Sequence, residues 1–122
     1  MSEGIYDLNS FIQRLDEHGL HPDAAFWFYF SEEQQWKLII AEVKVGTEGP
    51  KKIYRKMREI LENYPDVPGL SLDDVSLTRP DSPIIALLRT AIQTGHGISG
   101  IRFKNNVING TLIEDAYIYR LN

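Results

Sequence analysis

The chain has 122 residues, no cysteine and a formal net charge of −4 at pH 7. This length suits one domain, and the lack of cysteine excludes a disulfide framework and a thiolate metal site. The net charge argues against a nucleic-acid footprint spread over the whole protein. No apolar run approaches the roughly 18 residues of a membrane span, and the start at Met1 lacks the features of a signal peptide. We therefore expect a cytoplasmic protein without a membrane partner.

The first third of the chain predicts a helix followed by two strands. A helical stripe lies between Asp7, a candidate N-cap, and Gly19, a candidate C-terminal stop. The stripe consists of Leu8, Phe11, Ile12 and Leu15. Residues 24–30 include five consecutive aromatic side chains, which suit a strand covered on both faces. A polar turn separates this strand from a return strand that we expect over residues 36–45.

The rest of the chain predicts two more helices, a short strand and a terminal hairpin. The second helix opens near Pro50 and ends at Pro65, and the third opens at Pro83 and ends at Gly95. Residues 75–78 predict a strand between them. The element order is α-β-β-α-β-α-β-β. It predicts a single α+β domain over residues 1–122, with one mostly antiparallel sheet of about five strands and three helices packed on it.

The terminal hairpin has a register that can be written from the sequence. Asn109-Gly110 lies between two alternating runs, and a two-residue loop there pairs Ile108 with Thr111. The face that we expect to meet the core carries the pairs Val107/Leu112, Asn105/Glu114, Phe103/Ala116 and Ile101/Ile118. The face that we expect to meet solvent carries Asn106/Ile113, Lys104/Asp115, Arg102/Tyr117 and Gly100/Tyr119.

The solvent face of this hairpin is a candidate binding surface. Its candidate residues are Arg102, Lys104, Tyr117 and Tyr119, with His96 at the edge. Arginine and tyrosine are enriched where proteins recognise partners. A plain solvated sheet face has the same composition, so both interpretations stay open.

Three contacts are expected on the same face. Lys104 and Asp115 form an opposite-charge pair, and Arg102 lies over the ring of Tyr117. Tyr119 covers Gly100, as aromatic residues do beside strand glycines.

Residues 95–100 match the pattern G-x-G-x-x-G, but a helix precedes this loop and a strand follows it. The dinucleotide fingerprint requires the reverse order, so no nucleotide cofactor is predicted. His96 lies between two glycines and is either a loop residue or a candidate acid–base group. A backbone anion site in this loop stays open. No other cofactor is expected.

A second pattern points to a different chemistry. Glu42-Val43-Lys44 ends an apolar strand, and Asp23 begins the preceding strand. This resembles the PD-(D/E)xK nucleases. The resemblance implies that Asp23 and Glu42 hold Mg²⁺ and that Lys44 assists the attacking water. Pro-Asp occurs three times in the chain, so that dipeptide alone is not specific.

The expected register of the first hairpin would place these three residues on one face. If Ser31 pairs with Trp36, then Asp23 faces Lys44 and the partner of Glu42 is Ala25, so the three ionisable groups share one face. A basic helix would then contact phosphates. Its cations are Lys51, Lys52, Arg55, Lys56 and Arg58.

Two functions therefore remain open. The first is a non-enzymatic accessory or regulatory module that binds another protein or a small ligand at His96, Arg102, Lys104, Tyr117 and Tyr119. The alternative is a metal-dependent nuclease using Asp23, Glu42 and Lys44, the one hypothesis that includes nucleic acid. An unpaired edge strand would also allow two copies to form a homodimer.

Overall fold

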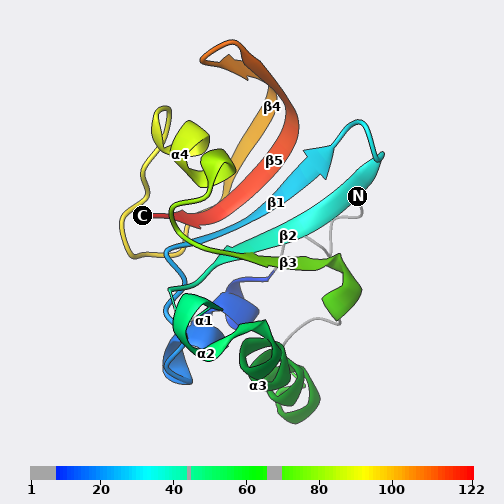
Figure 1. Ribbon diagram of the computed structural model, residues 1–122, viewed down its shortest axis with the longest axis vertical. Helices are drawn as coiled ribbons and strands as arrows, with labels where there is room; N and C mark the ends of the chain where they lie inside the picture. Colours follow the sequence, from blue (N-terminus) through cyan, green and yellow to red (C-terminus); the bar gives the residue numbers. More distant parts are fainter. Residues whose placement is uncertain (1–7, 44, 66–69) are drawn as a thin grey trace.

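The computed structural model describes residues 8–43, 45–65 and 70–122 as one α+β domain (Figure 1). The elements are α1 (Asn9–Glu17), β1 (Ala24–Phe30), β2 (Gln35–Ala41), α2 (Val45–Glu48), α3 (Pro50–Asn63), η2 (Leu72–Asp74), β3 (Val75–Thr78), α4 (Pro83–Arg89), β4 (Ile101–Ile108) and β5 (Thr111–Leu121). The predicted fold class and order of elements are confirmed, and the predicted helices correspond to α1, α3 and α4. The expected end of the third helix at Gly95 is wrong, because α4 ends at Arg89. The short helices α2 and η2 were not predicted. The expected N-cap Asp7 lies outside the described residues.

The sheet has five strands in the order β3-β2-β1-β5-β4. Three of its pairings are antiparallel, but β2 and β3 run parallel, so the sheet is mixed and not mostly antiparallel as expected. The reason is the connection between them. Parallel neighbours need a long crossover, and the chain from β2 to β3 supplies one through α2, α3 and η2.

Helices cover both faces of this sheet, with α1 and α3 on one side and α4 on the other (Figure 1). Side chains alternate between the two faces along each strand. In β1, Ala25 and Trp27 join the core beneath α1 and α3, whereas Ala24 and Phe26 join the core beneath α4. This two-sided burial explains why the aromatic strand carries no polar alternation.

The β1–β2 hairpin has a different register from the expected one. Phe30 pairs with Gln35 and Ala24 pairs with Ala41, so the expected pairing of Ser31 with Trp36 is wrong. The return strand also ends at Ala41, earlier than expected, because its partner strand β1 begins opposite it at Ala24. Apolar residues on both faces leave no alternation that would fix the register in advance.

The terminal hairpin follows the predicted register, from Ile101↔Ile118 to Ile108↔Thr111. Its two faces, however, exchange sides halfway. Val107 and Leu112 are 67% and 55% exposed, so their expected burial is wrong. The faces exchange at Asn105, which has a φ of 54°. The residues on either side of Asn105 pair with β5, but Asn105 itself does not. Asparagine tolerates this left-handed conformation better than most residues do.

Candidate binding surface

The two hairpins of the sheet separate at one end. The β1–β5 ladder ends at Phe28↔Ala116, although β1 continues to Phe30 and β5 starts earlier, at Thr111. Beyond that point β1 continues with β2 and β5 continues with β4, and the two pairs splay apart (Figure 1). The separation leaves a notch in the sheet.

A hollow of about 510 Å³ lies at this notch, on the face that α1 and α3 cover elsewhere. Its lining residues are Tyr29, Trp36, Lys104, Asn105, Glu114 and Asp115. Two cross-strand pairs flank it, the aromatic pair Tyr29↔Trp36 and the charged pair Lys104↔Asp115. The two aromatic rings lie 5.4 Å apart. We call the surface formed by Tyr29, Trp36, Arg102, Lys104 and Asp115 the open face.

Asp115 is held by an arginine and not by the lysine that was expected to pair with it. The Nε and Nη2 atoms of Arg102 donate to the two carboxylate oxygens of Asp115 at 2.6 and 2.5 Å. Such a two-point contact fixes both side chains. The Asp115 side chain is 14% exposed, whereas that of Arg102 is 41% exposed. The open face thus carries an oriented ion pair with an exposed lysine, Lys104, beside it.

The two predicted tyrosines lie at different depths. Tyr119 is 0% exposed and packs in the core beneath α1 and α3, so its expected position on the solvent face is wrong. Tyr117 is half-buried, and its ring lies 5.2 Å from that of Tyr119. Its hydroxyl also covers Gly100, because a Cβ atom there would lie 2.6 Å from the Tyr117 oxygen. Tyr117 therefore has the covering role that was expected of Tyr119.

His96 is exposed but lies at the other end of β5. The side-chain amide of Asn122 lies 3.2 Å from its Nδ1 atom. The loop that contains His96 runs alongside the end of β5, because the amides of Thr94 and Ser99 donate to the carbonyls of Leu121 and Tyr119. Asn122 lies seven residues from Asp115, roughly 20 Å along an extended chain. The structure does not bring His96 to the open face.

The acidic residues of the nuclease-like pattern lie where the β1–β2 hairpin opens. Asp23 and Glu42 flank the pair Ala24↔Ala41, and Glu42 is buried at 4% exposure. The observed register therefore sets Asp23 beside Glu42, whereas the expected register gave Ala25 as the partner of Glu42. Lys44 itself lies outside the described residues. Within residues 8–43, 45–65 and 70–122, no group of three histidine, aspartate or glutamate side chains is arranged to hold a metal ion.

One buried ion pair had no signal in the sequence. Arg120, whose side chain is 6% exposed, contacts the carboxylate of Asp16 at the end of α1. The same guanidinium donates to the carbonyl of Pro22 at 3.2 Å. These contacts join α1, the β1 entry and the end of β5, which is a structural role.

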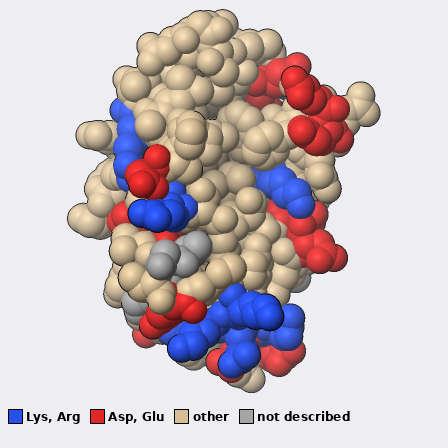
Figure 2. Space-filling view, in the orientation of Figure 1, with Lys and Arg blue, Asp and Glu red and all other residues tan. Residues whose placement is uncertain are grey.

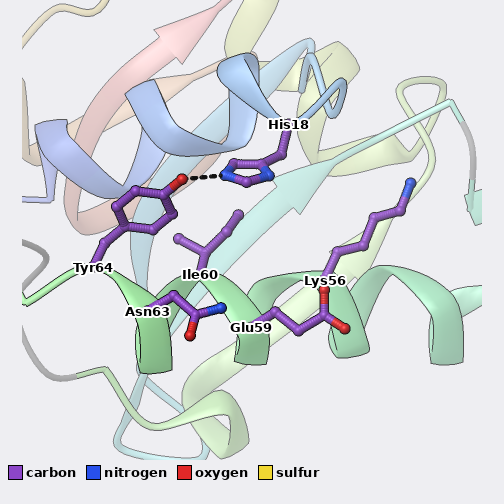
Figure 3. A pocket seen from close by; sticks show the side chains of 6 residues that line it. All are labelled: His18, Lys56, Glu59, Ile60, Asn63 and Tyr64. Atoms are coloured by element: carbon purple, nitrogen blue, oxygen red, sulfur yellow. Dashed lines mark hydrogen bonds between the residues drawn. The ribbon is translucent and has the colours of Figure 1, made fainter.

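A second hollow, of about 200 Å³, lies between the end of α1 and α3 (Figure 3). His18 Nε2 and the Tyr64 hydroxyl lie 3.0 Å apart at its wall, and the guanidinium of Arg14 stacks 4.2 Å from the centre of the Tyr64 ring. The side chains of Glu59 and Lys56 complete the rim (Figure 3). The hollow is smaller than a typical ligand site, and its lining residues contact one another. We therefore interpret it as a gap between packed helices.

Comparisons of the chain with protein-family models, curated proteins and solved structures find no match. In the part of the chain that the structure describes, no helix is both long and apolar enough to cross a membrane.

Proposed function

We propose that this protein is a non-enzymatic binding module that holds an extended segment of another protein on the open face. The main support is the divergence of β1 from β5 beside the hollow of about 510 Å³. Aromatic side chains next to arginine are typical of protein recognition surfaces. The hollow is broad and open, whereas small-molecule sites enclose most of their ligand. A protein segment therefore fits it better than a small ligand.

The backbone of β5 supports addition of a strand. Asn109 and Gly110 have φ values of 49° and 80°, as in the two-residue turn that makes Ile108 and Thr111 a hydrogen-bonded pair. Hydrogen-bonding direction alternates along a strand. Leu112 and Glu114 consequently direct their N–H and C=O groups away from β4, toward the notch. An extended partner would bind these groups, as in other cases of strand addition.

The side chains around the notch favour a particular kind of partner. A smaller hollow of about 250 Å³ adjoins the open face, with Phe28, Phe30 and Leu112 among its lining residues. The same lining includes Glu32, Glu33 and Glu114, and no lysine or arginine. We expect a partner segment with an apolar side chain at its centre and basic residues beside it.

Two proline variants test the backbone part of this proposal. Leu112→Pro removes an N–H that points into the notch, whereas Val107→Pro removes one that points to the outer edge of β4. Both positions are exposed and face each other across the ladder. Peptides selected from a random 12-residue display library on the wild-type protein should bind Leu112→Pro at least tenfold more weakly and Val107→Pro unchanged.

Failure of the library to yield any binder would contradict the proposal. Loss of binding in Val107→Pro alone would move the site to the edge of β4, the edge at which two copies were expected to pair. Thermal unfolding of both variants provides the control for folding.

The nuclease alternative keeps a separate test. It requires Asp23, Glu42 and Lys44 to act together on a divalent metal. The hairpin register sets the two acidic residues side by side, and Lys44 lies outside the described residues. Incubation with Mg²⁺ or Mn²⁺ and mixed DNA and RNA tests it. Cleavage that Lys44→Ala abolishes would replace the binding-module proposal, and absence of cleavage, or equal cleavage by the variant, would eliminate the alternative.

A further inference from the structure

The first half of α3 concentrates positive charge on the protein surface. Residues 51–58 contain five cations and no carboxylate. Of these cations, Lys51, Lys52, Arg55 and Arg58 are exposed and Lys56 is half-buried. The lower end of the molecule, where α3 lies, carries a group of lysine and arginine side chains (Figure 2). We call the five cations the basic face of α3.

Among the described residues, none of these five cations forms an ion pair. Within the residues that the structure describes, the ion pairs involve other cations, namely Arg14, His21, Arg79, Arg102 and Arg120. The carboxylates of Glu59 and Glu62 lie one helical turn beyond Arg55 and Arg58, and Glu48 precedes the helix, so acidic residues border the basic face at both ends. The five cations outnumber the three neighbouring carboxylates, so the basic face keeps an excess of positive charge that a partner can meet.

The arrangement is also unfavourable for the isolated helix. Lys51 and Lys52 occupy the first turn, where the helix dipole disfavours cations. Two pairs of cations stand four residues apart, Lys51 with Arg55 and Lys52 with Lys56. Equal charges at this spacing repel on a helix surface. An anionic partner would reverse the sign of each of these effects.

We propose that the basic face of α3 binds the phosphate backbone of a nucleic acid. Lys51, Arg55 and Arg58 form one exposed stripe, since residues spaced by three and four share a helix side. At 1.5 Å per residue the stripe spans about 10 Å. Phosphates follow one another every 3.4 Å along the axis of one strand of a duplex, so the stripe matches about three of them.

A nucleic acid fits this surface better than a membrane does. Helices that bind at a lipid surface place apolar side chains beside their basic ones. The apolar side chains of α3 instead pack on the core: Ile53, Met57 and Ile60 are buried, and Tyr54 and Leu61 are half-buried against the same core. Among the described residues, none of the exposed large apolar side chains lies on α3 beside the cations.

The basic face is separate from the open face, although both lie on the same side of the sheet. The helices α1 and α3 lie toward one end of the sheet, away from the end where β1 and β5 diverge (Figure 1). The hollow of the open face lies at that diverging end. The inference does not rest on the proposed partner-binding function, and either one can fail alone. If both hold, one molecule can bind a protein segment and a nucleic acid together.

Fluorescence anisotropy with a labelled 20-base-pair DNA duplex and a labelled 20-nucleotide RNA tests the inference. The buffers contain EDTA, so that metal-dependent cleavage plays no part. The test variant is Lys51→Gln/Arg55→Gln. The matched control is Lys37→Gln/Arg79→Gln, which lowers the net charge equally but leaves α3 intact. Thermal unfolding checks that both remain folded.

We expect the wild-type protein to bind at least one of the two polymers at 50 mM salt, with an affinity that falls as salt rises. The test variant should bind at least tenfold more weakly, and its slope of log K against log salt should be smaller by about two. The control should remain within twofold of wild type.

Three results would overturn the inference. The first is no salt-dependent binding of either polymer. The second is an equal loss in both variants, which would indicate net charge alone. The third is tighter binding of polyglutamate or of phosphatidylserine vesicles than of DNA and RNA.

Discussion

Arg120 contacts both carboxylate oxygens of Asp16, its Nη1 at 2.9 Å and its Nη2 at 2.7 Å, although 104 residues separate the two in the sequence. The contact joins the end of α1 to the end of β5. A planar guanidinium that donates twice to one carboxylate fixes direction as well as distance. This pair therefore orients the helix that closes one half of the sheet.

Asp16→Asn should destabilise the protein strongly, because it leaves the buried Arg120 charge without its counter-ion. We expect a loss of about 3 kcal/mol, the lower end for a broken buried pair, since Asp16 is partly exposed. Urea unfolding measures the loss. Glu17→Gln, which removes the partner of Arg14 on the same helix, should cost less than about 1 kcal/mol. Equal effects of the two variants would show that the Arg120 pair has no special role.

Gly100→Ala should destabilise the protein, because the new Cβ would meet the Tyr117 hydroxyl at 2.6 Å. The hydroxyl is the outer end of a half-buried side chain and can move, so we expect a cost near the lower end of the about 1–3 kcal/mol typical of overpacking. Adding Tyr117→Phe removes the hydroxyl and should recover part of the loss in a double-mutant cycle. Gly97→Ala is the control, since its Cβ meets no atom within 4 Å. Additive effects of Gly100→Ala and Tyr117→Phe would contradict the contact.

Leu112 and Ile113 provide a direct test of the exchange of faces in the hairpin. Leu112→Ser should change stability by less than about 0.5 kcal/mol because the side chain is exposed, whereas Ile113→Ser should cost about 3 kcal/mol or more because it is buried. Chemical unfolding of both variants measures the difference. The opposite ranking would restore the faces expected from simple alternation.

Position 105 should tolerate only residues that accept a positive φ. Asn105→Gly should be neutral or stabilising, and Asn105→Val should cost about 1–2 kcal/mol, because a branched side chain clashes in the left-handed region. Asn106→Val, one position along the same strand, should cost less since valine suits a strand. Similar losses for the two valine variants would argue against a special backbone at Asn105.

Local signals in the sequence were sufficient for much of the fold. Asn109-Gly110 determines its own turn, and the pairing of β4 with β5 follows from it over the whole ladder. The helices α3 and α4 likewise begin at the prolines that the sequence marks, Pro50 and Pro83, although α4 ends at Arg89, well before Gly95. Each of these features depends on residues close together in the chain.

The corrections concern features that depend on distant packing. The position of Tyr119 depends on α1 and α3, which cover that half of the sheet. The register of β1 with β2 could not be inferred, because a strand that is apolar on both faces satisfies either register. The parallel pairing of β2 with β3 could have been inferred from the intervening helix, which is typical of a crossover.

The candidate surface was predicted in part. Arg102 and Lys104 lie on the open face, as the hairpin register implied. Its aromatic residues, Tyr29 and Trp36, were expected only as members of the first two strands, with no role at the surface. That component becomes visible only when β1 and β5 are seen to separate. Divergence of two strands depends on the twist of the whole sheet and has no local sequence signal.

The central claim is that the open face holds an extended protein segment, and amide NMR tests it most directly. A peptide selected on the wild-type protein is titrated into the ¹⁵N-labelled protein, and chemical shifts and hydrogen exchange are followed for each amide. We predict that the largest shifts occur at Tyr29, Trp36, Leu112 and Glu114, and that the Leu112 and Glu114 amides gain protection from exchange. Shifts confined to α3, to the outer edge of β4 or to the loop around His96 would contradict the claim.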